Sequence, residues 1–328
     1  MDTKKEEAVA YLGPKASYTH QAALSEFPES KYIISPQTTI EDIFAAVQSS
    51  TASHGVVPFE NSSNGSVVFT LDLFADLHGR YPDISVCGEI YLQVHHCLLG
   101  HAAKSQGETA TSEPAHGIST QPGNPRVKPL HDIKHIKKLY SHPQAWGQCK
   151  LFLAAYFKGI ERQDVSSTSK AAELVAQNTT GSSAAISSRM AAGMNNLDVL
   201  AQGIEDNQGN STRFFIIRRQ QDVVAPDAQN ASVEMADYKT LVSFTVEHGE
   251  PGALADCLAI FKKHKLNLTS INTRPSGETP WHYVFFIEFR GRKRADGAGG
   301  AVNEALQELE KVAKNGRWLG SWSNKLKE

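Results

Sequence analysis

The sequence lacks the features that mark membrane-spanning, secreted and nucleic-acid-binding proteins. Its formal net charge is −2 over 328 residues, so no excess of positive charge favours nucleic acid or an anionic membrane surface. Its longest apolar run, LFLAAYF at 151–157, is far shorter than the roughly 20 residues that cross a bilayer. The N-terminal stretch MDTKKEEAVAYLG mixes acids with its lysines and has no apolar signal region. We therefore expect a cytoplasmic protein that binds neither membranes nor nucleic acid.

Motifs for metals, disulfides and nucleotides are also missing. The cysteines show no CxxC spacing, which argues against a zinc site and a disulfide framework; they are Cys87, Cys97, Cys149 and Cys257. Neither GxxxxGK[ST] nor, after the first strand, GxGxxG occurs, so nucleotide binding is unsupported. The run His95-His96-Cys97 could suggest a metal, but no partner motif accompanies it and a packed strand is the better interpretation. We expect neither a metal nor a cofactor.

What is present is typical of a globular α/β protein. Hydrophobic residues make up 40% of the chain and charged residues 21%, which is ordinary for such proteins. Strand-like and helix-like segments alternate through the first 220 residues. From residue 239 the pattern changes to β-α-β-β-α-β, a ferredoxin-like order. Two stretches interrupt this organisation: we expect 101–130 to be an exposed, disordered insertion and 220–238 to be an interdomain linker.

Hydroxyl and amide side chains recur where predicted strands give way to helices. These residues are Asn61, Ser62, Ser63, Ser141, Gln144, Gln148, Ser167, Thr168 and Ser169. In open α/β sheets, ligands bind outside the carboxyl ends of the strands, where helix N-termini also favour anions. Each residue alone has an ordinary explanation, and we expect Ser169 to be a helix N-cap. Together they indicate a polar ligand that carries carboxylates.

The stretch IEDNQGNSTRFFII (204–217) brings polar groups to the start of a core strand. A polar loop leads into four apolar residues, 214–217, that read as a buried strand. Ser211, Thr212 and Arg213 lie at the junction. A surface turn whose arginine pairs with a carboxylate explains this pattern as well as a binding site does.

Five motifs occur in the order found in one enzyme family. They are YLGP (11–14), VVPFENSSNGSV (56–67), YSHPQAWGQC (140–149), STSKAA (167–172) and IEDNQGNSTRF (204–214). In these motifs the chain resembles prephenate dehydratase. The segment PGALADCLAIFKKHKLNLTSINTRPS (251–276) resembles the phenylalanine-sensing ACT domain that usually follows. No helical segment precedes YLGP, so we expect no fused chorismate mutase.

The resemblance implies a fold and a reaction. The catalytic domain, 1–219, would have two lobes of the periplasmic-binding-protein type, with the site in their cleft. Lobe 1 would comprise about 8–93 and 204–219, lobe 2 about 94–203, and the ACT domain 239–328. Prephenate would lose its ring carboxylate and hydroxyl to give phenylpyruvate, carbon dioxide and water, without a cofactor. L-Phenylalanine would inhibit the enzyme allosterically. Contacts between ACT domains would join copies of the chain into a homodimer or homotetramer.

The resemblance also assigns residues. Thr212 would assist the departing hydroxyl, and Arg213 would be the cation beside it. The other substrate-binding residues would be Asn61, Ser62, Ser141, Gln144, Gln148, Thr168 and Phe214. Residues for the effector would be Gly252, Ala253, Leu254, Asn272, Thr273 and Arg274. Glu60 is the nearest carboxylate in a motif and could equally be a structural partner.

Two departures from the family pattern and two rival functions accompany this interpretation. KASYTH (15–20) replaces a Gly-Thr-Phe-Ser run, and Asn272 replaces the glutamate of the ACT motif, which predicts weaker inhibition by phenylalanine.

Arogenate dehydratase performs the same elimination on the amino-acid analogue and shares these motifs. A non-catalytic amino-acid sensor would keep the two-lobed fold, but it has no need of a leaving-group donor such as Thr212.

Overall fold

The chain divides into two compact units. The computed structural model describes residues 7–103, 124–178, 180–220, 237–294 and 299–326. Unit 1 comprises the described parts of Met1–Tyr11, Glu26–Tyr91 and Arg213–Glu328. Unit 2 comprises the described parts of Leu12–Ser25 and Leu92–Thr212. The chain crosses between the units at four points, which lie within β1 (Glu7–Leu12), α1 (Tyr18–Glu26), β5 (Ile84–Gln93) and β11 (Ser211–Arg219).

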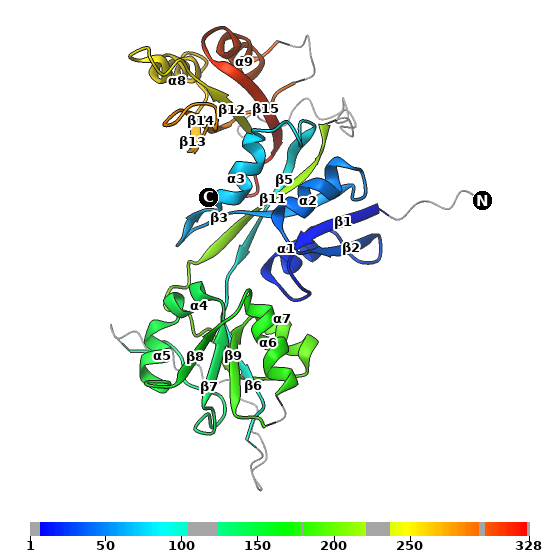
Figure 1. The fold of residues 1–328 in the computed structure, drawn as a ribbon, viewed down its shortest axis with the longest axis vertical. Coiled ribbons are helices and arrows are strands. Elements are labelled where there is room, and N and C mark those ends of the chain that lie inside the picture. The colour runs from blue at the N-terminus through cyan, green and yellow to red at the C-terminus, as the bar shows by residue number, and fades with distance from the viewer. Residues whose placement is uncertain (1–6, 104–123, 179, 221–236, 295–298, 327–328) are drawn as a thin grey trace, which may run out of the picture. The chain divides into compact units, whose positions relative to one another are not determined.

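Unit 1 contains a six-stranded sheet (Figure 1). Its spatial order is β2 (Tyr32–Gln37), β1 (Glu7–Leu12), β3 (His54–Asn61), β11 and β5, with β4 (Gly65–Ser66) paired to β3. The helices are α2 (Ile40–Gln48) and α3 (Val68–Ala75). A capping box between Thr39 and Asp42 starts α2. Residues 214–217 of β11 are buried, which confirms the predicted core strand.

Unit 2 contains a five-stranded sheet that is covered on both faces. Its spatial order is β10 (Asp198–Gln202), β6 (Cys97–Gly100), β9 (Ser183–Ser187), β7 (Lys138–Ser141) and β8 (Glu161–Asp164). Its helices are α1 (Tyr18–Glu26, whose last residue belongs to unit 1), α4 (Pro143–Gln148), α5 (Lys150–Tyr156), α6 (Thr168–Gln177) and α7 (Arg189–Asn195). Side chains of α4 and α5, including Phe152 and Leu153, pack in one core, while Ala171 and Val175 of α6 pack in another. The alternating α/β pattern predicted for this region is confirmed.

The C-terminal part of unit 1 is a four-stranded antiparallel sheet with two helices. The elements follow as β12 (Tyr238–Thr245), α8 (Ala253–Lys263), β13 (Leu268–Pro275), β14 (Tyr283–Arg290), α9 (Ala301–Val312) and β15 (Lys314–Ser323). The spatial order is β13-β14-β12-β15, so the predicted ferredoxin-like arrangement is confirmed. Phe244 and Ile287 from the sheet form its core with Phe261 of α8 and Leu309 of α9.

This C-terminal sheet packs directly on the N-terminal sheet of unit 1. The ring of Phe215 on β11 lies 5.1 Å from the ring of Trp322 on β15, and Trp322 is 1% exposed. Gly320 of β15 lies so close to β5 that a Cβ there would clash with the carbonyl of Val86. Strand β11, which carries Thr212 and Arg213, therefore packs against the C-terminal domain at Phe215.

Parts of the predicted insertion and linker lie outside the described residues, namely 104–123 and 221–236. The described ends of 101–130 are not all exposed. Ala102 and Val127 pack on the unit 2 core, and the Leu130 N–H donates to the Leu200 carbonyl at 2.8 Å. The predicted insertion, 101–130, therefore includes residues at both ends that pack on or hydrogen-bond to unit 2. Within the described ranges, no helix is long and apolar enough to cross a membrane.

Candidate active site

Several predicted site residues of unit 2 lie at one edge of its sheet. Strands β7, β8 and β9 run parallel, so their carboxyl ends meet at the same edge. The helices α4, α6 and α7 begin within a few residues of those strand ends. Ser141 ends β7, Gln144 and Gln148 lie on α4, and Thr168 begins α6. In α/β sheets this is the edge at which polar ligands bind.

The hydroxyl groups at this edge differ in accessibility. Ser141 is fully buried, and its Oγ donates to the Ile186 carbonyl at 2.8 Å, so the structure shows a hydroxyl that joins β7 to β9. Ser167, rather than Ser169, caps α6 by accepting from the Lys170 N–H at 3.0 Å. The prediction that Ser169 is the cap is therefore wrong. Gln144 is exposed and Thr168 is half-buried, and both stay predicted ligands.

Gln148 is held by a buried histidine. Its Oε1 lies 2.7 Å from Nε2 of His96, which is 2% exposed. The other ring nitrogen of His96 lies 3.1 Å from the hydroxyl of Tyr18. Sequence reasoning assigned His96 to a packed strand and gave Tyr18 no role. The two adjacent histidines before a core strand were the feature of the sequence that could have indicated a polar contact at this position.

The loop before β11 is fixed by its acidic residues. Glu205, 2% exposed, accepts from the His96 N–H at 2.8 Å and lies 3.0 Å from Nδ1 of His95. Asp206 accepts from the N–H groups of Lys150 and Leu151 at the start of α5. These bonds anchor residues 204–210 to unit 2 immediately before Thr212, which is half-buried.

The predicted residues of unit 1 surround the end of β3 and the start of β11. Asn61 is half-buried and accepts from the N–H groups of Ser63 and Asn64 at 3.0 Å each, while Ser62 is exposed. Glu60 lies opposite Ser66 in the β3–β4 pairing. Phe214 is 1% exposed, so its ring belongs to the core of the sheet in this structure.

Arg213 is part of a buried ion cluster. Its Nε and Nη2 donate to Glu89 Oε2 at 2.9 and 2.6 Å, and Nη2 also donates to Glu288 Oε2 at 2.6 Å. Lys239 lies 3.3 Å from Glu89, and all four side chains are less than a tenth exposed. Burial tends to raise the pKa of Glu89, but the positive charges of Arg213 and Lys239 hold it below its ordinary value.

These contacts argue against the predicted role of Arg213. Two carboxylates of the protein already bind the guanidinium, and its 6% exposure leaves little surface for a substrate carboxylate. Glu89 comes from β5 and Glu288 from β14 of the C-terminal domain. The cluster therefore joins the strand after Thr212 to the C-terminal domain.

Comparison with known proteins agrees with the motifs. The model of the family described as prephenate dehydratase matches residues 9–222. The chain belongs to the prephenate dehydratase family. An ACT domain model matches residues 240–312, which identifies the C-terminal domain.

Relatives share most of the chain's length. A prephenate dehydratase of Methanocaldococcus jannaschii is 30% identical over 93% of this chain and 94% of its own. A bifunctional chorismate mutase/prephenate dehydratase of Aquifex aeolicus is 33% identical over 99% of this chain and 76% of its own. A crystal structure of prephenate dehydratase from Arthrobacter aurescens in complex with L-Phe has a TM-score of 0.76, 26% identity and coverage of 97% of this chain and 90% of its own.

The departure from the family pattern at KASYTH has a local structural consequence. Ala16 adopts a φ of 64°, in the left-handed region that favours glycine. Its N–H donates to Nδ1 of His20 at 3.1 Å, and its carbonyl accepts from Ser188 Oγ at 3.3 Å. These bonds hold an alanine in a conformation that a glycine adopts without strain.

The predicted effector residues of the ACT domain divide into two groups. Gly252, with a φ of 92°, precedes α8, and Ala253 and Leu254 pack partly on the core. On β13, Asn272 accepts from Ser66 Oγ at 2.6 Å, and Arg274 binds both carboxylate oxygens of Asp72. These two side chains thus contact β4 and α3 within unit 1, and their role in binding an effector stays a prediction. Thr273 is exposed.

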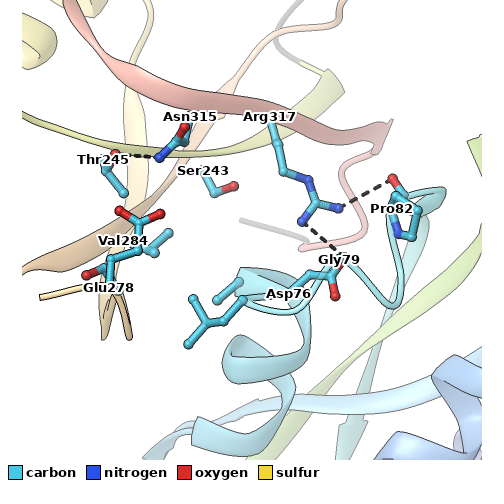
Figure 2. Close-up of a pocket in the computed structure, with 12 residues that line it drawn as sticks. Asp76, Gly79, Pro82, Ser243, Thr245, Glu278, Val284, Asn315 and Arg317 are labelled. Atoms are coloured by element: carbon cyan, nitrogen blue, oxygen red, sulfur yellow. Dashed lines mark hydrogen bonds and ion pairs between the residues drawn. The ribbon is translucent and has the colours of Figure 1, made fainter.

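A pocket also lies between the ACT domain and the loop after α3 (Figure 2). Its volume is about 290 Å³. Arg317 of β15 lines it and donates to the carbonyls of Phe74, Tyr81 and Pro82, with the Asp76 carboxylate 3.9 Å away. Arg317 therefore joins β15 to α3 and the loop that follows it. The pocket contains none of the residues predicted for the active site.

Proposed function

We infer that the chain is a prephenate dehydratase, which converts prephenate to phenylpyruvate, carbon dioxide and water in phenylalanine biosynthesis. The observation that carries this function is the match to a single-function relative over more than nine-tenths of both chains, together with the family match over residues 9–222. The elimination forms an aromatic ring, and that gain supplies its driving force. The reaction therefore needs a proton donor and binding groups rather than an electron sink.

We propose that Thr212 assists the departing hydroxyl. The ring carboxylate leaves as carbon dioxide, the electron pair of its C–C bond enters the ring, and the C–O bond breaks as the hydroxyl takes up a proton to leave as water. A hydrogen bond from Thr212 Oγ1 to that oxygen would stabilise the charge that develops on it. Threonine is a weak acid, so the contribution depends on its position. The fixed loop before β11 supports this proposal, because Glu205 and Asp206 anchor the residues that precede Thr212.

Neutral donors are the proposed binding groups for the substrate. Asn61, Ser62, Gln144, Gln148 and Thr168 offer amide and hydroxyl groups, and the N-terminus of α6 favours an anion. The ion pairs of Arg213 remove it from this list. A low-dielectric site strengthens such hydrogen bonds to a carboxylate.

We also propose that L-phenylalanine inhibits the enzyme through its ACT domain. The Arthrobacter aurescens structure in complex with L-Phe supports this, as does the presence of the ACT domain itself. The loop at Gly252, Ala253 and Leu254 would hold the amino acid through backbone groups. The Ser66–Asn272 hydrogen bond would carry the effect to the β3–β4 pair, in which Asn61 ends β3 and Ser62 follows in the turn.

The ACT domains are the proposed contact between copies in a homodimer or homotetramer. Strand β13 is an edge strand, and Ile271 on it is 51% exposed, so the edge is suited to association with a second copy. Sedimentation equilibrium tests this: a monomer at micromolar concentration, with and without phenylalanine, would contradict it. A cytoplasmic location stays a prediction, which cell fractionation would test.

Comparing substrates separates this function from its rivals. The purified chain is given prephenate and arogenate in parallel, and kcat/KM is measured for each from the phenylpyruvate or phenylalanine formed. A prephenate dehydratase favours prephenate, whereas an arogenate dehydratase favours arogenate. Binding without turnover of either compound would indicate the amino-acid sensor.

A further inference from the structure

The pocket between the ACT domain and the loop after α3 contains a buried hydroxyl that the protein leaves unsatisfied. Ser276, which follows β13, lines the pocket and is 4% exposed. Among the residues that the structure describes, its Oγ has no hydrogen-bond partner. Ser243 of β12 adds a second hydroxyl to the lining and is 3% exposed. An unpaired buried hydroxyl costs free energy, so a molecule that hydrogen-bonds Ser276 would gain from filling this space.

Three charged side chains line the pocket, and two of them compensate each other. Arg317 Nη1 lies 3.9 Å from Asp76 Oδ2, and Asp76 also accepts from the N–H groups of Arg80 and Tyr81 at 2.7 and 3.0 Å. The third, Glu278, is exposed, and no hydrogen bond or ion pair joins its carboxylate to another described residue. The lining therefore carries one uncompensated negative charge.

The remaining lining favours a small, aliphatic occupant. The apolar part of the wall contains Ala75, Leu77, Pro82 and Val284, and no aromatic ring lines the pocket. In Figure 2 the side chains of Glu278, Ser243 and Arg317 follow one another across this space. The volume of about 290 Å³ is at the lower end for ligand pockets. A nucleotide or a large ring system is therefore a poor fit.

We propose that this pocket binds a small aliphatic primary amine in its protonated form. An ammonium group donates three hydrogen bonds and accepts none, which suits the Glu278 carboxylate and the hydroxyl oxygens of Ser243 and Ser276. Its positive charge would compensate Glu278, whereas a carboxylate would be repelled. The bound amine would join the ACT domain to the loop after α3. The inference goes beyond the proposed function, because no step of it involves prephenate.

Three probes of similar shape test the charge requirement. At neutral pH isobutylamine is a cation, isobutanol is neutral and isovalerate is an anion. Binding of each to the purified chain of residues 1–328 is measured by ligand-observed NMR at constant ionic strength. Isobutylamine should bind about tenfold more tightly than either of the others. Equal binding of isobutanol or isovalerate would contradict the proposal, as would the absence of saturable isobutylamine binding in the millimolar range.

Variants of the lining locate the bound amine. Glu278→Gln should weaken isobutylamine binding about fivefold, the upper end for an ion pair near solvent, and Ser276→Ala about threefold through one lost hydrogen bond. Glu310→Gln is the matched control, because Glu310 is an exposed glutamate of α9 that does not line the pocket. This control should bind isobutylamine like the wild type. Equal weakening by Glu278→Gln and Glu310→Gln would indicate unspecific attraction of a cation and would overturn the proposal.

Filling the pocket provides a second readout. Isobutylamine should raise the melting temperature of the wild type, because a ligand that binds only the folded state stabilises it. Ser243→Leu places a large side chain in the pocket and should abolish this rise, and an equal rise in the folded variant would contradict the proposal. If Ser243→Leu does not fold, the comparison of Glu278→Gln with Glu310→Gln still decides. None of these measurements uses prephenate, so a failure of the proposed function leaves their outcome unchanged.

Discussion

At the scale of single residues, adjacent positions on β11 lie in different surroundings. Thr212 follows a loop that Glu205 and Asp206 fix, and it is half-buried. Arg213 is buried with Glu89 and Glu288. The alternation of side chains along a strand explains why neighbours can serve opposite faces. Thr212 stays the proposed leaving-group donor, while Arg213 joins the strand to the ACT domain.

Replacing Thr212 tests its role as the leaving-group donor. Thr212→Ala should lower kcat about a hundredfold or more and change KM by no more than about threefold, because a transition-state interaction is lost. Thr212→Ser keeps the hydroxyl and should retain most of the activity. Steady-state kinetics with prephenate measure both, and normal turnover in Thr212→Ala would remove the residue from the mechanism.

Replacing Arg213 tests the ion cluster. Arg213→Met leaves Glu89 and Glu288 buried without this cation, which should lower the free energy of unfolding by about 3–5 kcal/mol. The exposed pair of Arg80 and Glu41 is the matched control, and Arg80→Met should cost no more than about 1 kcal/mol. Urea unfolding measures both. A stable Arg213→Met variant with a strongly raised KM would restore the arginine to the substrate site.

At the scale of elements, sequence patterns predicted what is local. The apolar run at 214–217 predicted the buried part of β11, because such a pattern is set by neighbours along the chain. The pattern could not predict that Arg213 contacts Glu89, 124 residues away. A cation at the start of a strand gives the same sequence pattern whether it binds a ligand or a carboxylate of the protein. Nor could the pattern show that His96 meets Gln148, 52 residues later. The sequence could therefore propose site residues by their chemical type, but it could not predict the distant residues that they contact.

The close approach of β15 to β5 gives a test of ACT docking. Gly320 has a φ of 133° and faces the Val86 carbonyl, so Gly320→Ala should force the strands apart and lower the melting temperature. In the same strand, a Cβ at Gly316 meets nothing within 4 Å, so Gly316→Ala should have a small effect. Thermal unfolding measures both. Equal melting temperatures for the two variants would contradict the close packing of the strands.

The contact between β13 and β4 gives a test of regulation. Ser66→Ala removes the hydrogen bond to Asn272 and should raise the phenylalanine concentration for half-inhibition about fivefold, as one hydrogen bond allows. Turnover without phenylalanine should stay near wild type. Ser49→Ala is the control, because Ser49 bonds the Ala46 carbonyl and Thr51 instead. Unchanged inhibition in Ser66→Ala would place the coupling elsewhere.

At the scale of the whole molecule, the ACT domain and the N-terminal sheet form one compact unit. Their contacts include the Arg213 cluster, the Phe215–Trp322 ring contact and the Arg274–Asp72 ion pair. An effector bound to the ACT domain therefore acts on the same unit that carries Asn61 and Ser62. Regulation follows if phenylalanine binds one arrangement of this unit more tightly than another.

We infer that this chain converts prephenate to phenylpyruvate, and one assay tests that conversion itself. The purified chain of residues 1–328 is added to prephenate at neutral pH, and the absorbance of phenylpyruvate is followed against a sample without protein. We expect many turnovers per chain and slower turnover when phenylalanine is added. Prephenate that binds and is recovered unchanged would contradict it.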